Sequence, residues 1–167
     1  MSYTSLYAVY KTKAVNIEEL HNGSGSGPAI WDYISIKHDG NKMPMFRKNI
    51  DYFWDLWKDS KYDRDEKAVF MSTFDNALIE IDHLEEFSKA CLKIHDNIIK
   101  HTEWQWNHFS DIGETALFLH RNHDHRCIGL GIGCTSVCDP WECWKPKEKE
   151  CWGVYAEIDS LKTEKKC

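Results

Sequence analysis

The sequence predicts a single α+β domain, in which a mixed or antiparallel sheet of about four strands packs against about four helices. Two observations lead to this class. The chain has 167 residues, the length of one domain with one core. In some segments the apolar residues recur at helical spacing, and in others apolar residues alternate along the chain. The two kinds of segment follow one another in mixed order rather than in strict strand–helix alternation. We expect the domain to span residues 1–160, with 161–167 as a charged C-terminal tail.

The first forty residues predict a strand, a short helix, a loop and a longer helix. Aromatic and β-branched residues favour a strand over 5–12. Asn16 is followed three positions later by a glutamate, the spacing of a capping box, which predicts one or two helical turns. Glycine and serine make 23–27 a loop, and Pro28 suits the start of a helix that ends at 39–40.

The middle of the chain predicts a helix, an ambiguous segment and a short strand. Aromatic residues at helical spacing predict an amphipathic helix over 47–59. Segment 61–74 fits either a short helix from Asp65 or a strand over 69–74, because short apolar runs fit both periods, and we favour the helix. Alternating apolar residues predict a strand over 77–81.

The next two helices have the clearest hydrophobic periodicity. Asp82 and Glu85 have the spacing of a capping box and predict the start of a helix that continues to about Lys100. A second helix is expected over 104–121, although Gly113 weakens it. The predicted inward residues are Leu84, Phe87, Cys91, Ile94 and Ile98 in the first helix, and Phe109, Ile112, Ala116 and Leu119 in the second.

The last third of the chain predicts two strands joined by a loop. In the first strand, 127–137, three branched residues alternate with glycines, which predicts one branched face and one bare face. We expect a neighbouring element to lie close against the bare face. Segment 139–150 reads as a loop, and 151–158 as a final strand.

Composition and charge narrow the class of function. The net charge of −6 disfavours direct binding to duplex nucleic acid, because affinity for phosphates comes mainly from Lys and Arg. No leader-like segment or long apolar run is present, so we expect neither secretion nor membrane insertion, and a cytoplasmic location. In a reducing compartment, the odd number of seven cysteines favours free thiols or a metal over disulfides.

A cluster of thiols and imidazoles predicts a possible zinc site in 120–151. Thiolates and imidazoles are the usual ligands of zinc, but three, four and seven residues separate the successive thiols, which is not the spacing of paired knuckles. The same cysteines can instead pack as small hydrophobic residues, or one can act as a nucleophile beside a histidine. The candidate ligands are Cys134, Cys138, Cys143 and Cys151, with His123, His125 and Cys127 as alternatives.

An acidic stripe is the second candidate site. Asp51, Asp55 and Asp59 repeat every four residues on one face of the predicted helix, where like charges cost about 0.2–0.5 kcal/mol per pair. Such a stripe is either a solvated face or a surface for a basic partner. Tryptophans are frequent anchors in protein interfaces. The predicted contact residues are Asp51, Asp55, Asp59, Asp63, Asp65, Glu66, Trp141 and Trp144.

Segments 7–13, 19–31, 72–75 and 135–141 together resemble the small orphan accessory proteins of tailed phages. The resemblance implies expression in a bacterial host and binding to a host defence or regulatory protein, and it transfers no catalytic residues. We therefore expect a non-enzymatic protein that inhibits a host protein with a basic or nucleic-acid-binding surface, and that needs no cofactor. The alternative is a zinc- or cysteine-dependent enzyme, or a metal-stabilised module, centred on 120–151.

Overall fold

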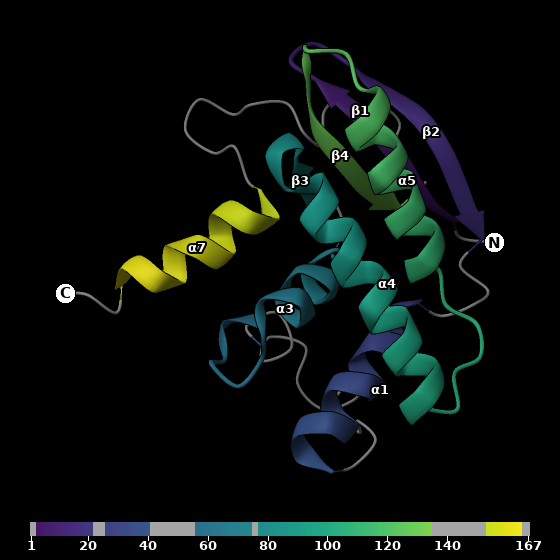
Figure 1. The fold of residues 1–167 in the computed structure, drawn as a ribbon, viewed down its shortest axis with the longest axis vertical. Helices are drawn as coiled ribbons and strands as arrows, with labels where there is room; N and C mark the ends of the chain where they lie inside the picture. The colour runs from purple at the N-terminus through teal and green to yellow at the C-terminus, as the bar shows by residue number, and fades with distance from the viewer. Residues whose placement is uncertain (1–2, 22–25, 41–55, 75–76, 135–152, 165–167) are drawn as a thin grey trace.

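The computed structural model describes residues 3–21, 26–40, 56–74, 77–134 and 153–164. It confirms the α+β single domain. Its four-stranded antiparallel sheet has the order β2-β1-β4-β3, formed by β1 (Tyr3–Tyr10), β2 (Ala14–His21), β3 (Ala77–Glu80) and β4 (Cys127–Cys134). The helices of the described residues are α1 (Ser26–Asp39), α3 (Arg64–Met71), α4 (Leu84–His101), α5 (Phe109–Asn122) and α7 (Val154–Glu164), with 3-10 turns η3 (Leu56–Lys58) and η4 (Ile81–His83) (Figure 1).

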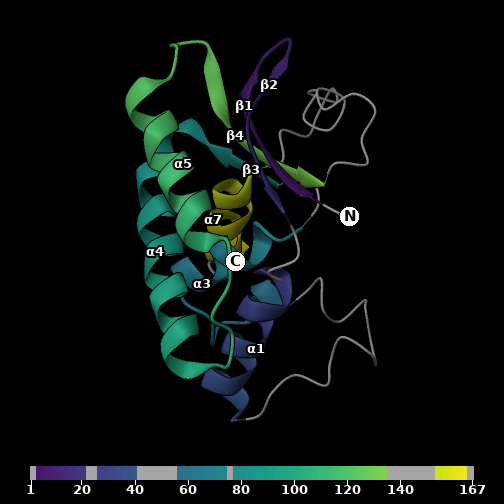
Figure 2. The same cartoon turned by 90° about the vertical axis from the view of Figure 1, so that its right-hand side faces the viewer.

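The helices α4 and α5 pack side by side on one face of the sheet (Figure 2). Helix α4 also contacts α1 and α3, so it lies at the centre of the helical layer. The core forms where the inward side chains of the four strands meet the helices, because alternate residues of a strand share one face. The buried strand residues of this core are Leu6, Ala8, Leu20, Ala77, Ile79, Cys127, Leu130 and Ile132.

The predictions for four helices and three strands are confirmed; the strands are β1, β3 and, as far as the structure describes it, β4. The helix predicted from Pro28 is α1, and the ambiguous segment 61–74 forms α3 rather than a strand. Both long amphipathic helices bury the residues that their periodicity predicts, although α5 begins at Phe109 rather than at Trp104. Gly40, just after α1, has a φ of 73°, the left-handed conformation that often ends a helix.

A capping box is present, but at the start of α3 rather than at the start of α4, where one was predicted. Asp63 and Glu66 form a complete capping box at the start of α3, in which each side chain accepts a hydrogen bond from the other residue's backbone N–H. The box predicted from Asp82 is wrong. The chain enters α4 directly from the turn η4, and the N-cap residue is His83, which makes no side-chain capping bond.

Two predicted elements have the opposite secondary structure. The turns expected near Asn16 are instead the strand β2, which pairs with β1 across the 11–13 turn. The strand expected over 151–158 is wrong where the structure describes it, since α7 begins at Val154 and buries Val154, Tyr155 and Ile158 at helical spacing. Of the helix predicted over 47–59, residues 47–55 lie outside the described residues, and 56–58 form η3.

Strand β4 contains an irregularity that its alternating pattern did not indicate. Val9 pairs with Gly129, whereas Tyr10 pairs with Cys127, so Ile128 is an extra residue, as in a β-bulge. Ile128 packs with Val9 in a second, small apolar cluster on the face of the sheet away from the helices. The prediction that it shares a face with the other branched residues of β4 is therefore wrong.

The predicted close approach to the glycines of β4 is confirmed at Gly129. A Cβ atom placed there would lie 2.1 Å from the backbone oxygen of Ile79 in β3. Any larger residue at this position would therefore push β3 away. In the described part of the chain, no helix is long and apolar enough to cross a membrane.

Candidate functional site

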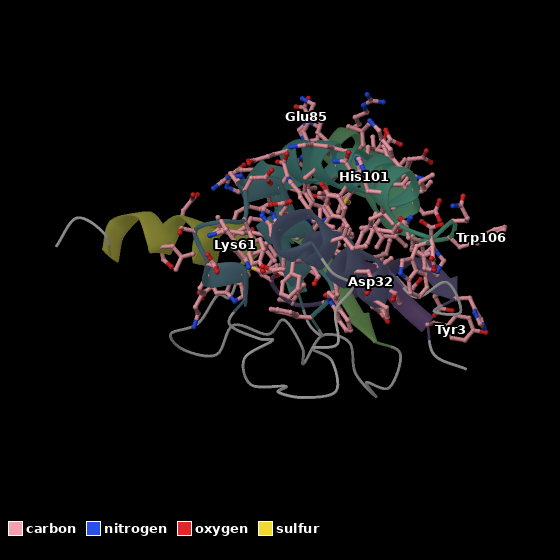
Figure 3. The ribbon with its side chains drawn as sticks, turned by 90° about the horizontal axis from the view of Figure 1, so that it is seen from below. Tyr3, Asp32, Lys61, Glu85, His101 and Trp106 are labelled. Carbon is pink, nitrogen blue, oxygen red and sulfur yellow. The ribbon has the colours of Figure 1, made fainter. Side chains whose placement is uncertain are left out.

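Trp106 is the most exposed large hydrophobic residue among the described residues, with 77% of its surface accessible. It lies in the connection between α4 and α5, and its side chain points away from the body of the molecule (Figure 3). Water contact with an indole this large is unfavourable, and tryptophan is enriched among the residues that dominate binding energy in interfaces.

Polar side chains hold the connection on both sides of Trp106. The indole Nε1 of Trp104 donates a 2.7 Å hydrogen bond to Asp32 in α1. The Thr102 hydroxyl accepts from the backbone N–H of Trp104 and donates to the carbonyl of Ile98. Asn107 is buried and accepts a hydrogen bond from the backbone at the start of α5. The segment is thus fixed without regular secondary structure, and little ordering is needed to present Trp106 to a partner.

A pocket of about 350 Å³ lies between α5 and the edge strand β2. Three carboxylates line it, and no lysine or arginine is among its described lining residues. At its rim Phe118 is 58% exposed, on the polar stripe of an otherwise amphipathic helix. The lining residues are Ile17, Glu18, Asp111, Glu114, Thr115 and Phe118.

Contacts between α5 and β2 fix the shape of this pocket. The Thr115 hydroxyl donates to the Glu18 carboxylate, which holds one acid in place. At the start of α5, His108 Nε2 lies 2.6 Å from the His21 carbonyl, and its Nδ1 lies 3.6 Å from the Asp111 carboxylate. The Thr115–Glu18 and His108–His21 contacts thus attach α5 to β2 at two positions, Glu18 and the last residue of the strand, His21.

Trp106 precedes His108 by two residues, so it lies at the end of α5 that meets the last residue of β2. An exposed indole, a group of carboxylates and an exposed phenyl ring therefore follow one another along α5. We call this the α5–β2 surface, and it consists of Ile17, Glu18, Trp106, Asp111, Glu114 and Phe118.

The acids predicted to bind a partner have a different environment in the structure. Glu66 has no exposed surface, and its carboxylate lies 2.7 Å from Lys37 Nζ and 3.1 Å from His38 Nε2. Asp65 pairs with Lys93 at 2.5 Å, and Asp63 lies 3.8 Å from the same ammonium group. Asp59 is exposed. Local cations thus lie beside Asp63, Asp65 and Glu66, whereas Asp51, Asp55, Trp141 and Trp144 lie outside the described residues.

The structure brings few of the predicted zinc ligands together. Cys127 is buried, while His123 and His125 are exposed on the turn before β4. Burial raises the pKa of the Cys127 thiol, which makes the thiolate that zinc or a nucleophilic reaction needs less available. Among the described residues, no three His, Cys, Asp or Glu side chains form a group able to hold a metal. The backbone of Cys134 ends β4, and Cys138, Cys143 and Cys151 lie outside the described residues.

The sequence analysis missed every residue of the α5–β2 surface. Phe118 did carry a signal, because it follows Asp111 and Glu114 on the polar side of α5, where the pattern calls for a polar residue. The contact of Glu18 with this helix had no signal in the sequence, because the pattern around Asn16 predicts a helical turn instead of the strand β2. Comparisons of the chain with protein-family models, with curated proteins and with solved structures give no match.

Proposed function

We propose that this chain is a non-enzymatic binding protein, and that the α5–β2 surface contacts a basic segment of another protein. The observation that carries the proposal is the pocket between α5 and β2, which gathers three carboxylates beside the exposed ring of Phe118. A lysine or arginine of the partner would meet Glu18, Asp111 and Glu114, while its apolar neighbours would cover Phe118 and Trp106.

Electrostatics and packing favour such a partner over a small-molecule substrate. Exposed carboxylates without adjacent lysine or arginine attract a positive surface and raise the rate of association. Exposed aromatic rings at the two ends would supply the apolar anchors, which carry most of the binding energy in protein interfaces. Both features extend over several turns of α5, a length suited to a polypeptide.

The resemblance to phage accessory proteins suggests the identity of the partner. On that basis, we propose that the partner is a bacterial host protein involved in defence or regulation, and that it is met in the host cytoplasm. Binding by an acidic surface would inhibit a host protein by covering its basic region, such as one that contacts nucleic acid.

Affinity purification from host lysate tests this proposal when the surface is altered in a matched way. Glu114→Lys reverses a charge in the pocket, and Asp82→Lys reverses an exposed acid on η4 as the control. We expect one stoichiometric partner at low salt, loss of that partner at high salt, and affinity lower by about tenfold in Glu114→Lys alone.

A second pair of variants tests the apolar part of the surface. Phe118→Ala should weaken binding, whereas Leu92→Ala, at another exposed apolar residue on α4, should not. Recovery of no partner at low salt would contradict the proposal. Equal recovery by the pocket variants and their controls would place binding on another surface.

A further inference from the structure

A second pocket, of about 460 Å³, lies between two tight turns at the end of the sheet. One turn is the β1–β2 connection at 10–13, and the other, at 125–128, leads from α5 into β4. The turns are adjacent because Tyr10 of β1 pairs directly with Cys127 of β4. We call this cavity the basic pocket.

Backbone hydrogen bonds close both turns, so the walls of the basic pocket are already formed. The N–H of Tyr10 donates to the Lys13 carbonyl at 2.8 Å. The N–H of Cys127 donates to the Asp124 carbonyl, also at 2.8 Å. A preformed site loses less conformational entropy when a ligand binds.

Cationic side chains surround this pocket, in contrast to the net charge of −6 for the whole chain. Lys11, Lys13 and Arg126 line it, and His125 adds a further charge when protonated. Lys13 Nζ lies 5.3 Å from the centre of the Tyr10 ring, within the range of a cation–π contact.

Asp124 orients the basic side chains of the second turn and offsets part of their charge. Its carboxylate accepts hydrogen bonds from Arg126 Nε at 3.1 Å and from Arg126 Nη2 at 2.6 Å. The same carboxylate lies 3.0 Å from His125 Nδ1. Lys11 and Lys13 of the first turn have no acidic partner among the described residues.

Thr12, Tyr10, Cys127 and Ile128 complete the lining, which apart from Thr12 is mainly apolar. The bulge in β4 turns Ile128 to the face of the sheet away from the helices, whereas Tyr10 and Cys127 pack with the main core. The volume falls within the roughly 300–1,000 Å³ range of small-molecule sites. A cationic rim on an apolar lining fits a ligand with an anionic group attached to an apolar or aromatic body, better than a bare inorganic ion.

We propose that the basic pocket binds a small aromatic phosphate of nucleotide size, with its phosphate between Lys11, Lys13 and Arg126 and its ring system against Tyr10 and Ile128. The phosphate would replace water around the two lysines and Arg126 and form charge-assisted hydrogen bonds with them. The aromatic body would bury the exposed part of the lining. This site lies on the 10–13 and 125–128 turns and is separate from the α5–β2 surface.

Three probes separate the two halves of this proposal. Adenosine monophosphate carries both a phosphate and an aromatic body, inorganic phosphate carries only the anion, and adenosine only the body. We expect calorimetric titration of the full chain to give an affinity for the monophosphate at least about tenfold above that of either other probe. Amide signals of 10–13 and 125–128 should shift in its NMR spectrum.

Variants then tie binding to the pocket. Lys11→Glu with Lys13→Glu should lower the affinity by about tenfold or more, and Lys100→Glu, at an exposed lysine on α4, should leave it unchanged. All three residues are exposed, and far-ultraviolet circular dichroism checks that each variant is folded.

Four outcomes would overturn the proposal. They are no binding of the monophosphate, equal binding of one of the partial probes, an unchanged affinity in the double variant, and binding of an oligonucleotide without the monophosphate. The last would show that the cations serve a polymer instead of a small ligand.

Discussion

The Glu66 carboxylate is a charged group with no exposed surface, and it links two helices. Its side chain accepts the N–H of Asp63 at the start of α3 and reaches Lys37 and His38 at the end of α1. A buried charge is tolerated only when it is paired and hydrogen-bonded, and Glu66 is both. Its place in the sequence, between Asp65 and Lys67, gave no sign that it was internal.

Replacing Glu66 should therefore destabilise the fold. We expect Glu66→Ala to lower the free energy of unfolding by about 2 kcal/mol, because Lys37 and His38 lose their hydrogen-bond partner and α3 loses half of its capping box. Lys93→Ala removes the exposed partner of Asp65 and should cost less than about 1 kcal/mol. Urea unfolding of both variants measures the difference. Equal losses would contradict the structural role of Glu66.

Glu86 makes the free energy of unfolding depend on pH in the acidic range. Burial opposes its charge, but hydrogen bonds from Arg64 and His83 outweigh burial and hold the pKa of Glu86 below its ordinary value of 4.5. A carboxylate with a lowered pKa in the folded state contributes stability above its ordinary pKa. That contribution is lost as the pH falls through the lower, folded value.

Glu86→Gln removes this titration. Below about pH 5, the free energy of unfolding of wild type should fall more steeply with decreasing pH than that of the variant. At neutral pH the variant should be the less stable protein, because Arg64 loses one of the two acidic partners that it has among the described residues. Parallel pH profiles of urea midpoints for the two proteins would exclude Glu86 as a source of the acid dependence.

The described thiols should be inert in the folded protein. Burial raises the pKa of Cys91 well above its ordinary value and raises that of Cys127 as well. Iodoacetamide at neutral pH should therefore leave both unlabelled until the chain is unfolded, as peptide mapping can show. Metal analysis of the same sample tests the zinc hypothesis, and one equivalent of zinc would favour the metal-stabilised alternative. Rapid labelling of native Cys127 would contradict its burial.

At the scale of the elements, prediction succeeded where local periodicity and packing agree. Helices α4 and α5 have one apolar face each, and the same residues are buried in the structure. It failed at β2 and α7, whose conformations depend on distant partners. β2 exists because it pairs with β1, although Asn16 lies in a helix-capping pattern.

The first turn of helix α7 is capped by the side chain of Glu80, which lies 75 residues before Tyr155 in the sequence. The Glu80 carboxylate accepts the backbone N–H of Tyr155 at 3.1 Å and that of Ala156 at 2.7 Å. An acid at this position satisfies free amides and interacts favourably with the helix dipole. Gly153 permits the approach, since a Cβ there would lie 2.0 Å from the Glu80 carboxylate.

Gly153→Ala and Glu80→Ala should act through the same contact. Each should lower the protection of α7 amides from hydrogen exchange by about 1 kcal/mol, the value of a lost cap. The double variant should lose little more than either single one, because the added methyl group displaces the same carboxylate. Ser160→Ala, at an exposed residue of α7, is the control. Additive losses would show that the two residues act independently.

At the scale of the whole molecule, folding separates acids that are neutralised from acids that remain available. The acids near α3 lie beside cations of α1 and α4, whereas those along α5 and β2 surround a pocket without lysine or arginine among its described lining residues. The sequence predicted an acidic, aromatic surface as a class. It could not place that surface, because Glu18 and Asp111 are joined only by the contact of β2 with α5.

The most direct test of the central proposal is a photo-crosslink from the α5–β2 surface. A photoreactive phenylalanine analogue is placed at Phe118, and at Ala156, an exposed residue of α7, as the control. We predict that the host partner crosslinks to position 118, that Glu114→Lys abolishes the crosslink, and that position 156 gives none. A partner that crosslinks at 156 and not at 118 would contradict the account.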